Sequence, residues 1–173
     1  AASAISEESA KHGVPVMEGM WTRFLPAIMR AKEKIGSGQI GEVKAVNADL
    51  AFAHEYAPDS RLYSKALGGG AALDLGVYLL SLSLHLFGEP VTASGAWQSA
   101  PSGVDEAVQF RLTYAGFEAK LSASIARTGG NVFEITGSNG VLRIESPFIA
   151  GTRLRLLRGL AARAVVVIDG DGK

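Results

Sequence analysis

The sequence predicts an α+β fold, in which an open, mainly antiparallel mixed sheet has helices packed on one face. Two observations lead to this prediction. After residue 90, strand-like segments follow one another with short turns between them, as antiparallel neighbours require. Before residue 90, segments with helical spacing of apolar residues alternate with strand-like ones.

Each expected element rests on its apolar pattern and on the residues that end it. Gly13 ends a polar helix, Pro26 begins a second helix that ends at Gly36, and three glycines begin a third. The turns expected at 114–117 and 137–140 indicate hairpins. The expected helices are 3–12, 26–36 and 68–87, and the expected strands are 14–17, 42–53, 91–99, 104–114, 117–126, 131–136, 141–145, 153–158 and 164–168.

Composition places the chain among globular proteins. Its 173 residues are 47% hydrophobic and 20% charged, which is enough apolar material for a core. Lys and Arg together number 17, as do Asp and Glu, so the basic excess of a nucleic-acid-binding protein is missing. Cysteine is absent, which excludes disulfides and thiolate chemistry and fits a cytoplasmic protein. No apolar run approaches the ~20 residues of a membrane span, so we expect no membrane partner.

Residues 36–41, GSGQIG, match the glycine pattern of dinucleotide-binding loops. That loop must follow a strand and begin a helix, so that the helix N-terminus meets the pyrophosphate. Here the expected helix comes first and the strand second. We therefore interpret these glycines as the end of a helix and a turn.

The segment GGGAALDLGVY, residues 68–78, carries the best candidate for chemistry. Asp74 and Tyr78 are four residues apart, so an α-helix would place them on one face, one turn apart. A carboxylate beside a phenol can orient a general acid that acts on a carbonyl or alcohol. In the alternative interpretation, Tyr78 is a core aromatic and Asp74 a helix-start charge. Spacing alone favours that alternative, because polar pairs at this spacing are common.

Four segments together resemble a known family. They are MEGMWTRFLPA (17–27), QIGEVKAV (39–46), SRLYSKALGGGAALDLGVYLLSLSLHLFG (60–88) and ITGSNGVLRI (135–144). These segments are similar to the C-terminal part of the glucose–fructose oxidoreductase, inositol dehydrogenase and rhizopine catabolism protein family (Gfo/Idh/MocA). Within it, they most resemble the branch of dimeric trans-dihydrodiol dehydrogenases.

The resemblance implies a two-domain oxidoreductase. Residues 1–20 would be a remnant of an N-terminal Rossmann domain that holds NAD or NADP, and residues 21–173 the C-terminal substrate and dimerisation domain. The family's Glu-Lys-Pro motif, whose lysine is catalytic, would fall shortly before Ala1. We therefore expect this chain alone to be inactive.

The resemblance also implies roles for individual residues. Tyr78 matches the tyrosine that this branch uses as acid and base, and Asp74 matches its acidic partner. Arg61 and Trp21 would contact substrate, and Arg23 would lie near the cofactor. The alternative for both arginines is a surface or structural ion pair. No spacing typical of metal ligands is present.

The implied function is hydride transfer between a nicotinamide and a small sugar-like, diol or carbonyl substrate. A homodimer through the open sheet is expected, because strands after residue 90 carry apolar residues on both alternations, as in 164–168. The alternative is a non-catalytic binding or dimerisation module with the same fold. A hydrolase with two catalytic carboxylates has little support, because no second carboxylate pairs with Asp74 in the sequence.

Overall fold

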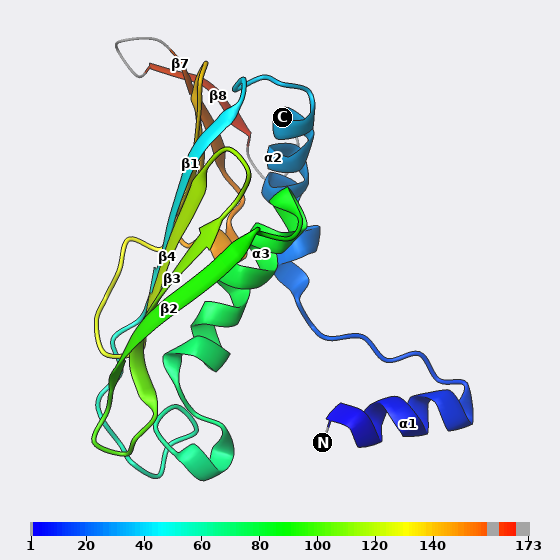
Figure 1. Cartoon of the computed structure of the whole chain (residues 1–173), viewed down its shortest axis with the longest axis vertical. Helices are drawn as coiled ribbons and strands as arrows, with labels where there is room; N and C mark the ends of the chain where they lie inside the picture. Colours follow the sequence, from blue (N-terminus) through cyan, green and yellow to red (C-terminus); the bar gives the residue numbers. More distant parts are fainter. Residues whose placement is uncertain (1, 159–162, 169–173) are drawn as a thin grey trace.

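The computed structural model describes residues 2–158 and 163–168 and shows one open sheet with helices beside it (Figure 1). The helical elements are α1 (Ala2–His12), η1 (Trp21–Phe24), α2 (Pro26–Gly36), η2 (Lys65–Leu67), η3 (Ala72–Gly76), α3 (Val77–Phe87) and η4 (Phe148–Ala150). The strands are β1 (Val43–Ala51), β2 (Thr92–Ser99), β3 (Asp105–Thr113), β4 (Glu118–Ser124), β5 (Phe133–Gly137), β6 (Val141–Ile144), β7 (Leu154–Arg158) and β8 (Arg163–Ile168).

The sheet has eight strands in the order β2-β3-β4-β1-β5-β6-β7-β8. β1 runs parallel to β4, and the other neighbouring strands pair antiparallel. Hairpins join β3 to β4 and β5 to β6 at the two expected turns. The predicted fold class and every strand expected after residue 40 are therefore confirmed.

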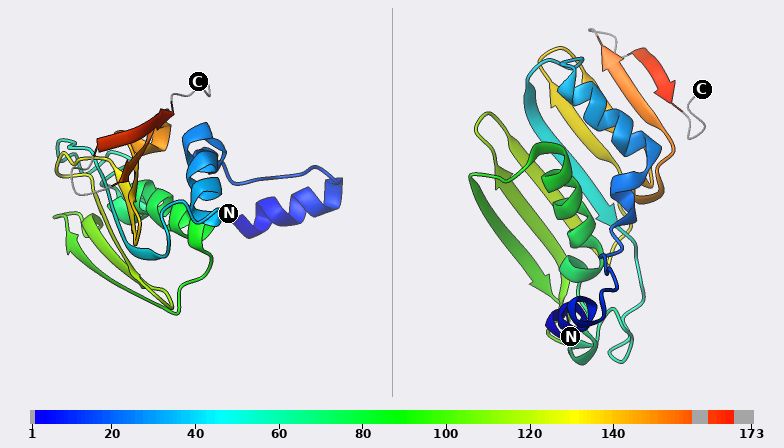
Figure 2. Two further views of the ribbon diagram at one scale, coloured as in Figure 1. Left: turned by 90° about the horizontal axis from the view of Figure 1, so that it is seen from above. Right: turned by 90° about the vertical axis from the view of Figure 1, so that its right-hand side faces the viewer.

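Two helices cover one face of the sheet (Figure 2). α2 packs on β6 and β7, while α3 packs on β4 and β1. The side chains between them are buried, among them Leu79, Leu82, Leu121 and Phe133. Each such side chain contributes roughly 1.5–3 kcal/mol to the free energy of unfolding. This layer fixes α3, and with it the candidate site, on the sheet.

The opposite, open face of the sheet is polar. In β1, Val46, Ala48 and Leu50 are buried on the helix side, whereas Asn47 and Asp49 lie on the other face. The expectation of apolar residues on both alternations concerned strands after residue 90, and it is wrong for β3 and β4, where Gln109, Arg111, Lys120 and Ser122 line the open face. Residues 164–168, on which that expectation also rested, have side chains outside the described part of the chain.

The N-terminal segment has no packed core of its own. α1 is confirmed as a helix but buries none of its residues. The short buried strand expected at 14–17 is wrong, since the segment is irregular and Val14, Val16 and Met17 are exposed at 58%, 59% and 75%. In the described structure these apolar residues have no neighbouring strand to pair with. Figure 1 shows α1 standing apart from the sheet at the end of an extended linker.

The stretch Lys65–Phe87 is long and apolar enough to cross a membrane by length and composition alone. Half of its most apolar window is buried inside the domain. Packing on the sheet therefore accounts for its apolar character. The GSGQIG segment lies between the end of α2 and the start of β1, so it follows a helix and precedes a strand, as predicted.

Candidate functional site

The three glycines at 68–70, before η3, let neighbouring backbone and side-chain atoms come closer than a Cβ would allow. A Cβ on Gly69 would lie 2.5 Å from the carbonyl oxygen of Leu62, and one on Gly70 would overlap the Asp105 carboxylate. Gly70 also has φ of +126°, a conformation that other residues rarely adopt. Asp105 Oδ2 accepts a hydrogen bond of 2.6 Å from the backbone N–H of Ala72. Asp105 thus caps the first turn, a role that its distance in sequence concealed.

The helix begins with a π-helical turn, residues Ala72–Gly76, before it becomes the α-helix α3. The N–H of Val77 reaches the carbonyl of Ala72, five residues earlier. Gly76 makes room at this turn, since a Cβ there would lie 2.9 Å from the ring of Phe110 in β3. Single π-helical turns inside helices occur frequently at functional sites. The expected α-helical spacing of Asp74 and Tyr78 is therefore wrong in detail, because Asp74 lies in the wider turn.

Asp74 is paired with Arg61. Arg61 Nη1 lies 2.5 Å from Asp74 Oδ1, and the side chains are 72% and 24% exposed respectively. The hydrogen bond and charge of Asp74 raise the pKa of Arg61, and the Tyr78 phenol adds a smaller contribution in the same direction. Arg61 and Asp74 therefore form a charged pair at the start of the helix, and Tyr78 follows Asp74 by four residues in the chain. Tyr78 itself is partly buried against the core.

Arg23, in η1, contacts the same helix further along its length. Its Nε donates a hydrogen bond of 2.9 Å to Ser81 Oγ in α3. Burial lowers the pKa of His85, and the positive charges of Lys32 and Arg23 lower it further. η1 thus places Arg23 beside Ser81 and His85, whereas the loop before η2 places Arg61 at Asp74.

An open depression of about 440 Å³ runs along α3 beside Arg23. Met17, Glu18, Met20, Arg23, Phe24, Val77, Leu80, Ser81 and Leu84 line it. Its walls combine exposed apolar side chains, such as Phe24 at 62%, with the guanidinium of Arg23. Trp21 begins the neighbouring turn and is 48% exposed, so its side chain is available to a ligand. Substrate contacts of Trp21 and Arg61 and cofactor contacts of Arg23 stay predictions.

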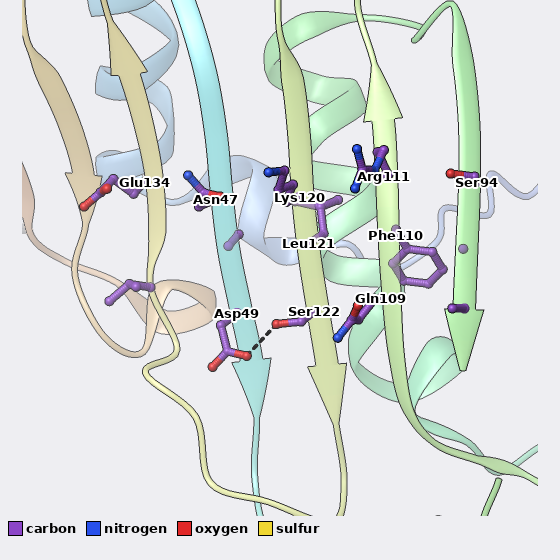
Figure 3. Close-up of a pocket in the computed structure, with 14 residues that line it drawn as sticks. Asn47, Asp49, Ser94, Gln109, Phe110, Arg111, Lys120, Leu121, Ser122 and Glu134 are labelled. Atoms are coloured by element: carbon purple, nitrogen blue, oxygen red, sulfur yellow. Dashed lines mark hydrogen bonds between the residues drawn. The ribbon is translucent and has the colours of Figure 1, made fainter. Parts of the chain in front are cut away.

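Sequence reasoning missed a second polar site on the open face, a depression of about 630 Å³ over β3, β4 and β1 (Figure 3). Asp49 Oδ1 accepts hydrogen bonds from Ser122 Oγ at 2.8 Å and from Arg127 at 2.5 Å, and Oδ2 accepts one from the N–H of Gly130 at 2.9 Å. Burial alone would raise the pKa of Asp49, but these bonds and the Arg127 charge outweigh it and lower the pKa. Asp49 therefore anchors the β4–β5 loop.

A row of charged and polar side chains crosses the same face. Strand register places Arg111 beside Lys120, Lys120 beside Asn47, and Asn47 beside Glu134. Arg111 also pairs with Glu118 at 3.2 Å. The only signal for this row in the sequence is the alternation of each strand, which does not show which strands are neighbours.

The described residues do not form a complete cofactor or metal site. In the described part of the chain, no group of three or more His, Asp or Glu residues is placed to hold a metal ion. The GSGQIG glycines follow a helix instead of starting one, so they do not form a cradle for a pyrophosphate. What the site offers is a phenol, an ion pair and a guanidinium along one helix.

Comparison with known proteins identifies the family. Residues 28–143 match the model of the GFO/IDH/MocA C-terminal domain. The chain belongs to this family. Trans-1,2-dihydrobenzene-1,2-diol dehydrogenase of Danio rerio is 33% identical over 80% of the chain, and that of Xenopus tropicalis is 34% identical over 83%. The chain spans 42% and 44% of these two relatives, which is less than half their length.

Solved structures share the fold of this family domain. An NAD binding oxidoreductase from Klebsiella pneumoniae matches 91% of the chain and 46% of its own, with 26% identity and a TM-score of 0.73. An aldose-aldose oxidoreductase from Caulobacter crescentus, complexed with glycerol, matches 99% of the chain and 52% of its own. Its TM-score is 0.81 at 22% identity, which establishes a common fold. The family recognised from four short segments is therefore confirmed.

Proposed function

We propose that this chain is the substrate-side domain of an NAD(P)-dependent oxidoreductase that acts on a diol, sugar-like or carbonyl substrate. The observation that carries the proposal is the Arg61–Asp74 ion pair at the π-helical turn, four residues before Tyr78 in the same helix. The two diol dehydrogenases and the NAD binding relative support the reaction class.

Each of the three residues has a distinct task. The Tyr78 hydroxyl would exchange a proton with the substrate oxygen that becomes a carbonyl or an alcohol. Asp74 and Arg61 form a positioning pair, and the outer N–H groups of the guanidinium, which is 72% exposed, would bind further substrate oxygens. The nicotinamide would supply or accept the hydride.

The cofactor, NAD or NADP, would be held mainly by a domain outside this chain. Residues 1–20 fit the role of a remnant of that domain, because α1 is unburied and the apolar residues after it are exposed. The substrate domain would begin at residue 21, where η1 docks on α3 through the Arg23–Ser81 hydrogen bond. Arg23 would face the cofactor from the depression beside α3.

We also propose a homodimer through the open sheet, held by charge complementarity. A two-fold axis parallel to the strands, between β4 and β1, would place Arg111 opposite Glu134 of the partner subunit. The same axis would place Lys120 opposite Asn47 of the partner subunit. Such polar pairs set register and orientation more than affinity. Partners would otherwise be small molecules, with no nucleic acid or membrane, and a cytoplasmic location stays a prediction.

The reaction is tested on the intact protein, in which this chain is joined to its native upstream sequence. NAD(P)-dependent oxidation of trans-dihydrodiols or aldoses, followed through the absorbance of the reduced nicotinamide, would support the proposal. A protein that binds NAD(H) or NADP(H) but oxidises and reduces none of these classes would instead be the non-catalytic module.

A further inference from the structure

The helix layer covers the sheet unevenly. α2 lies on β6 and β7, α3 lies on β4 and β1, and η3 at the start of the same helix lies on β4 and β3, whereas the edge strand β2 is exposed at all eight of its positions. Figure 2, in the view from the helix side, shows β2 at the edge of the sheet with no helix in front of it. The helix face of β2 is therefore bare in the described structure.

A groove of about 670 Å³ lies on this bare strip. Register with β3 places Ala93, Gly95 and Trp97 on the helix side, because they pair with Leu112, Phe110 and Val108, two of which are buried. Ala72 and Leu80 form the opposite wall. The small residues Ala93 and Gly95 leave a trough, and Trp97, which is 71% exposed, stands at its end.

The dimensions of the layer indicate what fills the groove. Strands lie ~4.8 Å apart and a helix with its side chains is ~10 Å wide, so one helix covers about two strands. α2 covers the pair β6–β7, and the helix formed by η3 and α3 covers β1, β4 and, through η3, β3. The next helix position therefore lies beside η3, over the exposed strand β2.

Other occupants fit less well. A strand added to the edge of β2 would satisfy the free backbone groups of β2 but would leave the groove uncovered. A polar ligand would find two charged side chains in the lining, Lys65 and Asp105, and Asp105 is already bonded to the N–H of Ala72. The lining instead suits an apolar helix face that carries side chains at every third or fourth position.

We propose that this groove is the seat of a third helix, supplied by sequence of the intact protein outside residues 1–173. The helix is amphipathic, and its apolar face lies on Ala93, Gly95 and Trp97. The diol dehydrogenase relatives, of which this chain spans 42% and 44%, carry ample further sequence to supply it. The proposal depends on family membership and not on the proposed activity.

Tryptophan fluorescence tests whether the groove is occupied. The chain has two tryptophans, so Trp21→Phe leaves Trp97 as its sole emitter, and in the intact protein every tryptophan outside residues 1–173 is replaced by phenylalanine as well. In this chain Trp97 should be readily quenched by acrylamide. In the intact protein its emission should shift to shorter wavelength, and quenching should fall severalfold at every protein concentration. Equal quenching in both proteins would overturn the proposal, and protection that disappears on dilution would indicate a second copy and overturn it too.

Substitution and cross-linking identify the occupant. Ala93→Asp should restore quenching in the intact protein, whereas Thr92→Asp, on the other face of the same strand, should not. A photoreactive benzoylphenylalanine in place of Trp97 should cross-link to a segment outside this chain whose apolar residues recur every three or four positions. Cross-links within residues 1–173, or to a segment of alternating pattern, would contradict a third helix.

Discussion

Arg61 and Asp74 form an ion pair, 2.5 Å between Nη1 and Oδ1, that ties the loop before η2 to the π-helical start of the site helix. The N–H of Gly70 reinforces this connection through a bond of 2.9 Å to the carbonyl of Leu62. The carboxylate of Asp105, in β3, adds a third link, because it accepts a hydrogen bond from the N–H of Ala72. These contacts hold the loop, the start of the site helix and the sheet together just before Tyr78 in the chain.

Gly70→Ala should destabilise the domain. The new Cβ would overlap the Asp105 carboxylate, and φ of +126° strains any residue but glycine. Strain of this kind costs about 1–3 kcal/mol. Chemical denaturation should show this loss, whereas Gly116→Ala, where a Cβ meets nothing within 4 Å, should leave the unfolding midpoint nearly unchanged. Equal stability of the two variants would show that the fit at Gly70 is unimportant.

Asp49 should make stability depend on pH in acid. Its pKa is lowered in the folded state, so its stabilising contribution is present above its ordinary pKa of ~3.9 and is lost as the pH falls through the lower folded value. At neutral pH, Asp49→Asn should lower the free energy of unfolding by about 1–3 kcal/mol. Denaturation curves should show that this difference shrinks below about pH 4. A difference that stayed constant across this range would contradict the assigned ion pair with Arg127.

This chain alone should not bind NAD(H) or NADP(H) tightly. The described residues lack a glycine loop between a strand and a helix start, which is what holds a pyrophosphate. Calorimetric titration of the isolated chain should give no detectable heat with either nucleotide at concentrations that saturate the intact protein. Micromolar binding to the chain would contradict the proposal that a domain outside this chain holds the nucleotide.

The proposed dimer should respond to charge reversal on the open face. Arg111→Glu would place carboxylates opposite Glu134 of the partner subunit and should shift the protein toward monomer. The double variant Arg111→Glu, Glu134→Arg restores opposite charges and should restore the dimer. Light scattering gives the mass in each case. A wild-type monomer, or a double variant no better than the single one, would contradict this arrangement.

Local patterns predicted most of the fold. The alternation in 42–53 and after residue 90 reports which side chains face a core, and this holds whichever strands are neighbours. The same reasoning predicted a strand at 14–17 and was wrong there, because an apolar run becomes a strand only beside another strand. No strand among the described residues lies beside this segment.

The site was predicted in part. The resemblance identified Tyr78, Asp74 and Arg61; the structure pairs Arg61 with Asp74, and the role of Tyr78 stays a prediction. The π-helical turn depends on how Phe110 meets Gly76, and the cap depends on Asp105, so both need the tertiary fold. The polar site on the open face was missed for the same reason, since alternation does not show which strands are neighbours and therefore which polar side chains lie together.

The most direct measurement compares the turnover of the intact protein with that of its Tyr78→Phe variant. Removing one hydroxyl leaves the ring packed against the core, so the unfolding midpoint should hardly change. A positioned proton donor contributes roughly 10²–10⁴-fold, and turnover should fall by that factor while nucleotide affinity stays the same. A Phe variant with normal stability and near-normal turnover would show that Tyr78 is a packing residue and would contradict the catalytic assignment.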